Sequence, residues 1–254
     1  MKRSALRIFR SVATIYVVLC VFMYFFQRSI LYHPRHVLPS PTGTCMTLDV
    51  PGATLQVCVR ERSGPAALIY FGGNAEDVSF SLNEFAAAFK QHTIYMLHYR
   101  GYGGSTGSPS EVALHADAQV LFDHVRATHP DVTLVGRSLG SGVAVRLAAN
   151  NPVRELVLVA SYDSILNLAK QRFWFMPVGL LLQDRFESWR DAPLVKAPTR
   201  IIAAEHDEVI PLTSTSALLK AFTPGIASMQ VIPRTSHNTI SNSAEYMRLV
   251  QGRE

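Results

Sequence analysis

From residue 66 onward, short apolar runs alternate with amphipathic stretches. The apolar runs are rich in β-branched and aromatic side chains, which is typical of buried strands, and lie at 66–71, 93–99, 131–135, 156–160, 199–204 and 229–232. The stretches between them predict helices around 82–89, 114–125, 141–150 and 214–222 and at the C-terminus. Repeated strand–helix–strand units predict an α/β fold, with a mostly parallel sheet covered by helices on both faces.

The residues before the helix at 114–125 predict where that helix starts. They are Ser108-Pro109-Ser110-Glu111. With Ser108 as N-cap, Pro109 in the first turn and Glu111 as the closing residue, this sequence matches a capping box. We therefore expect the helix to begin directly after Ser108.

Residues 162–193 interrupt the alternation. This segment is strongly apolar at 173–177 and 180–182, and Arg172, Arg185 and Arg190 are interspersed. Exposed apolar segments of this kind cover hydrophobic pockets. We expect a small lid over an acyl pocket; the alternative is an ordinary packing helix.

Before residue 66, two strands are predicted at 44–50 and 53–60, on either side of Pro51-Gly52. With a two-residue turn, Cys45 and Cys58 lie directly opposite each other on a non-hydrogen-bonded pair, where side chains approach most closely. A disulfide is allowed there and would fit an oxidising compartment. Two free thiols are the alternative, since the register of a hairpin can slip.

The N-terminus carries an uncharged run over 12–26, in which only Thr14 is polar. Its length of ~22 Å is short of the ~30 Å hydrocarbon core, but Arg10 and Arg28 can snorkel and extend it. A cleaved signal peptide is the rival, although no small-x-small site follows; a surface-lying or buried helix is a third possibility. We expect residues 1–32 to be a basic segment and single-pass membrane anchor, and residues 33–254 to be one domain.

Charge supports this division. The formal net charge is +5, but the first 28 residues hold five of the 24 Lys and Arg and no acid, so the remaining 19 cations balance the 19 acids. A nucleic-acid partner is therefore not expected, because such proteins carry a basic stripe on the folded domain. Four of the five cations precede the apolar run, which predicts a cytoplasmic N-terminus and an extracytoplasmic, periplasmic domain.

A candidate nucleophile lies between the strand at 131–135 and the helix at 141–150. Gly136-Arg137-Ser138-Leu139-Gly140 is a G-x-S-x-G sequence in a strand–turn–helix context, which is typical of a nucleophile elbow. The two glycines leave no Cβ beside a strained turn, and the following helix directs its N–H groups toward an oxyanion. The alternative is a glycine-rich turn with an idle serine.

A serine hydroxyl needs a base to take its proton and a third group to orient that base. Only His206 and His237 follow Ser138, and His237 lies after the last strand, whereas His206 reads as a loop residue. For the acid, Asp207 follows the next-to-last strand, and Asp163 is the rival. We expect Asp207, because the order Ser, Asp, His is the one used in this type of fold.

Two backbone N–H groups are needed to bind an oxyanion. Leu139 follows the nucleophile, and Asn74 ends Gly72-Gly73-Asn74 after a strand, so these two residues are the expected donors. Gly-Gly-Asn is also simply a good turn. The Cys and His residues lack zinc-ligand spacing and the glycine-rich run at 101–107 lacks the Lys of a P-loop, so neither metal nor cofactor is expected.

Five motifs occur in order: FGGNAED at 71–77, HYRGYGGSTGSPSE at 98–111, GRSLGSG at 136–142, EHDEVIP at 205–211 and SHN at 236–238. With them the chain resembles the membrane-anchored branch of the α/β-hydrolase-fold serine hydrolases, related to eukaryotic protein depalmitoylases and serine aminopeptidase-like hydrolases. The resemblance implies the α/β-hydrolase fold and Ser138, Asp207 and His237 as a catalytic triad. Two positions depart from the family pattern: Gly72 stands where His is common and His98 where Asp is common.

The sequence therefore predicts a membrane-anchored serine hydrolase. It would cleave an ester, thioester or amide of a small-molecule or acylated substrate through an acyl-enzyme. A serine aminopeptidase-like peptidase shares this machinery, and a non-catalytic binding module of the same fold is the third hypothesis.

Overall fold

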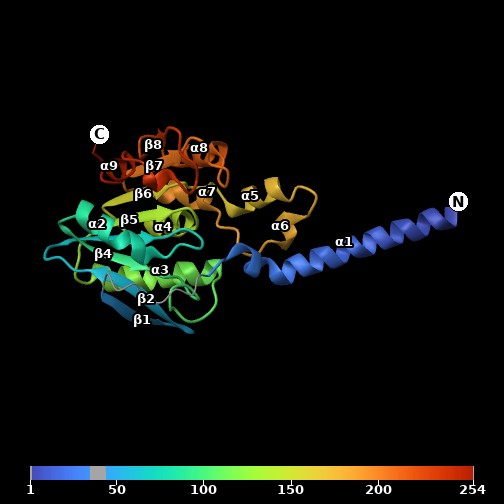
Figure 1. Cartoon of the computed structure of the whole chain (residues 1–254), viewed down its shortest axis with the longest axis horizontal. Helices are drawn as coiled ribbons and strands as arrows, with labels where there is room; N and C mark the ends of the chain where they lie inside the picture. The colour runs from blue at the N-terminus through green and yellow to red at the C-terminus, as the bar shows by residue number, and fades with distance from the viewer. Residues whose placement is uncertain (1, 35–43, 254) are drawn as a thin grey trace.

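A computed structural model of the chain describes residues 2–34 and 44–253. Its sheet has the strand order β1-β2-β4-β3-β5-β6-β7-β8 (Figure 1). The strands are β1 (Thr44–Val50), β2 (Ala53–Arg60), β3 (Ala66–Phe71), β4 (His92–Leu97), β5 (Asp131–Arg137), β6 (Glu155–Val159), β7 (Thr199–Ala204) and β8 (Ala227–Ile232). Within this sheet β2 runs opposite to the other seven strands, so the predicted mostly parallel α/β arrangement is confirmed.

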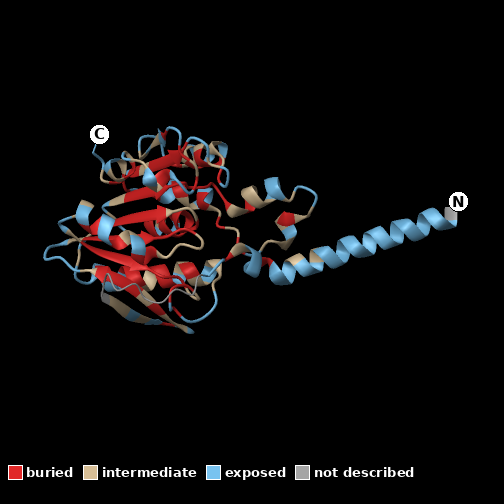
Figure 2. Ribbon diagram, viewed as in Figure 1, coloured by how far each residue is buried: buried red, intermediate tan, exposed pale blue. Residues whose placement is uncertain are grey.

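Helices cover both faces of the sheet. The helices of the described residues are α1 (Lys2–Leu31), α2 (Leu82–Ala88), α3 (Glu111–Arg126), α4 (Leu139–Asn150), α5 (Ile165–Arg172), α6 (Val178–Leu181), α7 (Ser188–Asp191), α8 (Leu212–Ala221) and α9 (Tyr246–Val250), with 3-10 turns η1 (Val78–Ser81), η2 (Ala192–Leu194) and η3 (Ile240–Asn242). One core cluster joins the sheet to α3, α4 and α8, and a second joins it to α2 and α9. Consecutive strand residues alternate between the two clusters, as the two-residue period of a strand requires; Figure 2 shows this buried interior in red.

The predicted start of α3 is wrong by two residues. Its N-cap is Ser110, whose hydroxyl accepts a hydrogen bond from the N–H of Ala113, and the helix begins at Glu111. The Glu111 carboxylate accepts a hydrogen bond from the N–H of Arg185 (2.6 Å). A tertiary contact thus uses the side chain that a capping box would require.

The hairpin of β1 and β2 has the predicted register. Cys45 lies opposite Cys58 and the two form a disulfide. This covalent link ties the edge strand β1 to β2, whose other neighbour is β4.

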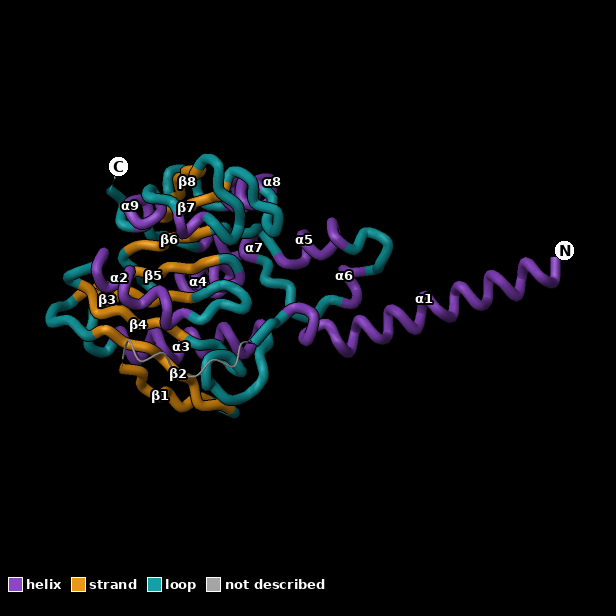
Figure 3. The backbone as a smooth tube through the Cα atoms, in the orientation of Figure 1, coloured by secondary structure: helices purple, strands orange, loops and turns teal. Residues whose placement is uncertain are grey.

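The helix α1 projects from the body of the molecule. Residues 162–193 form the lid segment, and its α5 and α6 lie beside the C-terminal half of α1 (Figures 1 and 3). Arg3–Leu31 is long and apolar enough to cross a membrane, a criterion that a signal sequence also meets. The helix ends at Leu31, next to the predicted boundary at residue 32. Residues 35–43 of the predicted domain lie outside the described residues, and the division into anchor and domain stays a prediction.

Candidate active site

Ser138 occupies a strained turn between β5 and α4, with φ 49° and ψ −117°. Glycine is required on both sides of this turn. A Cβ on Gly136 would lie 2.6 Å from the carbonyl oxygen of Gly140, and a Cβ on Gly140 would lie 2.1 Å from the carbonyl oxygen of Phe71. The close approach of α4 to β3 and β5 therefore holds the Ser138 hydroxyl out of the sheet, as a nucleophile elbow does.

The structure brings Ser138, His237 and Asp207 together from three separate loops. His237 Nε2 lies 3.0 Å from Ser138 Oγ, and His237 Nδ1 lies 2.8 Å from Asp207 Oδ2. The loops follow β5, β8 and β7, which run parallel in the β5-β6-β7-β8 half of the sheet. Because parallel strands end at the same edge, residues 99 positions apart in sequence meet there. This geometry allows the imidazole to take the serine proton and the carboxylate to orient the imidazole.

Asp207, rather than its rival Asp163, pairs with the imidazole. Its Oδ1 also accepts hydrogen bonds from the N–H groups of Val209 (2.9 Å) and Ile210 (2.7 Å), and its side chain is only 2% exposed. The Asp163 carboxylate instead accepts hydrogen bonds from the side chains of Ser214 and Asn167.

His206, the alternative base, lies on the surface. Its side chain is 72% exposed and its charged neighbour is Glu205, at 3.5 Å.

The two predicted oxyanion donors flank Ser138. A Cβ on Gly73 would lie 3.4 Å from Ser138 Cβ, which places the Gly72-Gly73-Asn74 turn against the serine. Leu139 is the first residue of α4. Within 2–34 and 44–253, the N–H groups of Asn74 and Leu139 donate to no protein acceptor. Both are thus available to a bound oxygen, and their role stays a prediction.

Sequence reasoning assigned no role to a partly buried ion pair that connects these loops. Glu76 accepts a hydrogen bond from the N–H of Gly73 (2.6 Å) and pairs with Arg137 at 3.1 Å, and Arg137 also donates to the carbonyl of His237. Burial opposes the guanidinium charge, but the interactions with Glu76, Tyr70 and Tyr246 together outweigh it and raise the pKa of Arg137. Both residues occur within the quoted motifs, FGGNAED and GRSLGSG, which was the available signal.

The two departures from the family pattern have local explanations. A Cβ on Gly72 would lie 2.4 Å from Val78 Cγ1, so a larger side chain does not fit, and the Gly72 carbonyl accepts a hydrogen bond from Tyr99 (2.9 Å). His98 is buried with its Nε2 3.6 Å from the sulfur of Cys58, and burial lowers its pKa. In the part of the chain that the structure describes, neither Gly72 nor His98 forms a hydrogen bond or ion pair with Asp207 or His237.

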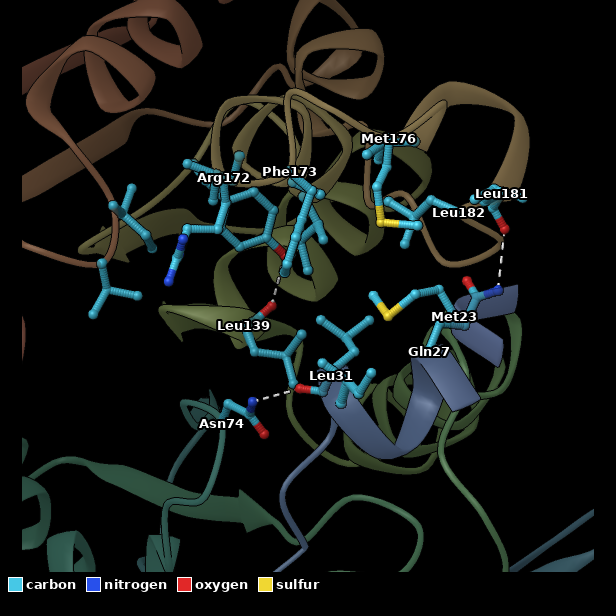
Figure 4. A pocket seen from close by; sticks show the side chains of 18 of the residues that line it. Met23, Gln27, Leu31, Asn74, Leu139, Arg172, Phe173, Met176, Leu181 and Leu182 are labelled. Carbon is cyan, nitrogen blue, oxygen red and sulfur yellow. Dashed lines mark hydrogen bonds between the residues drawn. The ribbon is translucent and has the colours of Figure 1, made fainter. Parts of the chain in front are cut away.

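A pocket of about 510 Å³ opens beside Ser138, with Asn74 and Leu139 in its wall. The lid forms a second wall, and the last turns of α1 form a third, which sequence reasoning did not anticipate (Figure 4). The clue was Gln27, an amide directly after the apolar run, which is buried in the structure. Residues of α1 and the lid that line the pocket include Met23, Gln27, Leu31, Phe173, Met176 and Leu181.

The pocket lining is mainly aliphatic and aromatic, with Arg172 and Glu208 as its charged members. In the part of the chain that the structure describes, no three His, Cys, Asp or Glu side chains are grouped to hold a metal ion. The apolar lining beside Ser138 suits an apolar acyl group whose carbonyl carbon the serine could attack.

The fold and the elbow are those of the α/β hydrolases, and comparison with known proteins leads to the same class. Residues 67–195 match the alpha/beta hydrolase fold family, and the chain belongs to it. Among solved structures, mouse alpha/beta hydrolase domain-containing protein 10 superposes with a TM-score of 0.66 at 17% identity, over 82% of this chain and 96% of that one. At this identity the likeness shows the fold alone.

Two sequence relatives extend the comparison. An uncharacterized protein of Mycobacterium tuberculosis H37Rv is 33% identical over 182 residues, which cover 69% of this chain and 64% of that one. The chain thus aligns with less than two thirds of the length of this relative. The lysophosphatidylserine lipase ABHD12 of Xenopus tropicalis is 30% identical over 168 residues, 57% of this chain and 43% of that one.

Proposed function

We propose that this protein is a membrane-anchored serine hydrolase that cleaves a long-chain acyl ester or thioester. The observation that carries the proposal is the Ser138–His237–Asp207 relay, with distances of 3.0 and 2.8 Å, at the wall of an apolar pocket. A relay of this geometry activates a serine, and an apolar pocket selects an acyl chain.

In this proposal, Ser138 Oγ attacks the carbonyl carbon of the substrate while His237 Nε2 takes the hydroxyl proton. The N–H groups of Asn74 and Leu139 bind the oxygen that becomes negative. The tetrahedral intermediate collapses, and the alcohol or thiol leaves with the proton from His237. Water then attacks the acyl-enzyme, gives its proton to His237 and releases the acid, which restores Ser138.

The acyl preference rests on the pocket wall, which is formed by apolar residues of α1 and the lid. A relative whose name is lysophosphatidylserine lipase supports an acyl ester as the substrate class. The wall offers no feature that favours an amide over an ester. The Ser138–His237 hydrogen bond argues against a non-catalytic binding module of the same fold, because binding alone does not require an activated serine.

Membrane attachment through α1 is part of the proposal. The uncharged run within α1, flanked by Arg10 and Arg28, supports a spanning helix. An extracytoplasmic domain is supported by the cations that precede the run and by the Cys45–Cys58 disulfide, since disulfides persist in oxidising compartments.

A series of p-nitrophenyl esters with acyl chains of two to sixteen carbons tests the proposal. We expect kcat/KM to rise by up to about fourfold per added methylene until the pocket is filled, because burying one methylene contributes about 0.8 kcal/mol. Ser138→Ala is the control and should remove the activity toward every ester. A flat chain-length profile would contradict the acyl pocket, and equal activity of Ser138→Ala would contradict the nucleophile.

A further inference from the structure

The outer surface of the lid is apolar where a lid in water would be polar. Residues 173–181, which we call the lid tip, direct Phe173, Met176 and Leu181 into the pocket. Trp174 and Leu180 lie outside the pocket wall and are 82% and 84% exposed. Phe175 is also 49% exposed, so the outer face of the lid tip carries three large apolar side chains, and exposed apolar surface of this kind indicates a partner.

The lid tip lies against α1 rather than apart from it. Near the middle of α1, the Tyr16 hydroxyl donates a hydrogen bond to the carbonyl of Phe175 (3.0 Å). Three turns further on, the Gln27 amide donates to the carbonyl of Leu181 (3.0 Å), a contact drawn in Figure 4. The lid tip therefore runs along α1 from Tyr16 to Gln27.

The length of α1 sets the depth of the lid tip. Lys2–Ile15, the part N-terminal to the lid contact, has 14 residues and includes Arg3, Arg7 and Arg10. At 1.5 Å per residue it reaches only about 21 Å, and a hydrocarbon core of about 30 Å does not accept its three guanidinium groups. A spanning α1 must therefore place Tyr16 to Gln27 within the hydrocarbon, together with the lid tip.

Positively charged side chains next to the lid tip are consistent with its placement in the hydrocarbon. Lys170 and Arg172 end α5, directly before the apolar tip, and both side chains are exposed. Arg28 is at the corresponding end of α1 and is bound to Asp184 of the lid segment (2.9 Å). Cations at this level suit lipid phosphates, and apolar side chains beyond them suit acyl chains.

We propose that the lid tip is inserted beside α1 into the near leaflet of a phospholipid bilayer, with Trp174 and Leu180 in contact with lipid acyl chains. The pocket lies between the lid and α1, so this insertion allows an acyl chain to enter from the bilayer without crossing water. The inference rests on the anchor in the proposed function, but it does not depend on catalysis.

Depth-dependent fluorescence quenching tests the insertion directly. The chain has two tryptophans, Trp174 and Trp189. The full-length Trp189→Phe variant is reconstituted into vesicles of phosphatidylcholine and phosphatidylglycerol with brominated acyl chains, and the matched Trp174→Phe variant, which retains only Trp189 on α7, is the control. We expect at least threefold stronger quenching of Trp174 than of Trp189.

Each other outcome overturns the inference. Protein that floats with the vesicles but shows equal quenching of Trp174 and Trp189 has its lid in water, and the anchor would stand alone. Protein that does not float with the vesicles lacks the anchor as well. Neither readout involves hydrolysis, so a failure of the proposed catalytic activity is detected separately by the ester series.

A kinetic comparison adds a second test. The rate on a vesicle-embedded long-chain ester, divided by the rate on a water-soluble short ester, should fall about tenfold in Trp174→Ser/Leu180→Ser. Phe80→Ser, at a 72% exposed site on η1, should keep the wild-type ratio. An unchanged ratio in the double variant, or an equal fall in Phe80→Ser, would overturn the insertion.

Discussion

The guanidinium of Arg137 donates a hydrogen bond to the backbone carbonyl of His237, across 100 positions of sequence and a distance of 3.3 Å. Arg137 directly precedes Ser138, and its other partner, Glu76, accepts a hydrogen bond from the N–H of Gly73. One partly buried ion pair therefore joins the elbow, the Gly72-Gly73-Asn74 turn and the loop that carries His237. We expect it to position these three loops relative to one another.

Replacing Arg137 should slow turnover more than it weakens binding. We expect Arg137→Gln to lower kcat about 10- to 100-fold with KM nearly unchanged, because small displacements of catalytic groups have effects of this size. Steady-state kinetics with a soluble ester, at a temperature where the variant is folded, measures both constants. Arg154→Gln, in an exposed pair with Asp131, is the matched control and should resemble wild type. A rise in KM alone would contradict the positioning role.

Asp207 and Asp163 should differ sharply in their effect on turnover. Asp207→Asn removes the carboxylate that orients His237 and should lower kcat by about 10⁴, the effect expected from the loss of a triad acid. Asp163→Asn changes a carboxylate bound to Ser214 and Asn167 and should retain most activity. The reverse pattern of kcat values would reassign the acid.

The Cys45–Cys58 disulfide should contribute to stability and not to catalysis. It closes a loop with a sequence separation of 13, at the edge of the sheet opposite β8, and the loss of such a crosslink costs about 3 kcal/mol. We expect Cys45→Ser/Cys58→Ser to unfold at lower denaturant concentration, with unchanged kcat on a soluble ester. Loss of activity in the folded variant would show that this edge supports the active site.

His98 should make the protein less stable in mild acid. Burial lowers its pKa in the folded state below the ordinary value of about 6.5, so the unfolded chain binds the proton first as the pH falls. Stability is therefore lost below pH 6.5. His98→Asn should show a smaller decrease in Tm between pH 7 and 5 than wild type, as measured by thermal melts. The exposed His206→Gln is the control; identical pH slopes in wild type and His98→Asn would rule out this contribution.

Much of the fold was predictable because its signals are local. Short apolar runs predicted the strands, and the two-residue turn at Pro51-Gly52 set the register that pairs Cys45 with Cys58. Chain order alone predicted which carboxylate would meet His237, because the ends of parallel strands share one edge of the sheet.

The features that were not predicted depend on tertiary contacts. The N-cap of α3 is Ser110, and the carboxylate of Glu111 accepts a hydrogen bond from the backbone N–H of Arg185 in the lid segment rather than closing a capping box. Hydropathy predicted α1 as an anchor but contained no information on its contact with the lid, which buries Gln27 and makes the helix a pocket wall. The pairing of Glu76 with Arg137 joins residues 61 positions apart.

Covalent labelling of Ser138 by a fluorophosphonate probe tests the central claim most directly. The folded wild-type protein should react at Ser138, identified by mass spectrometry of the labelled peptide, and Ser138→Ala should not react. His237→Ala should react at least a hundredfold more slowly, because the Ser138 hydroxyl would then lack the base that takes its proton. Folded wild-type protein that remains unlabelled at Ser138 would contradict the account.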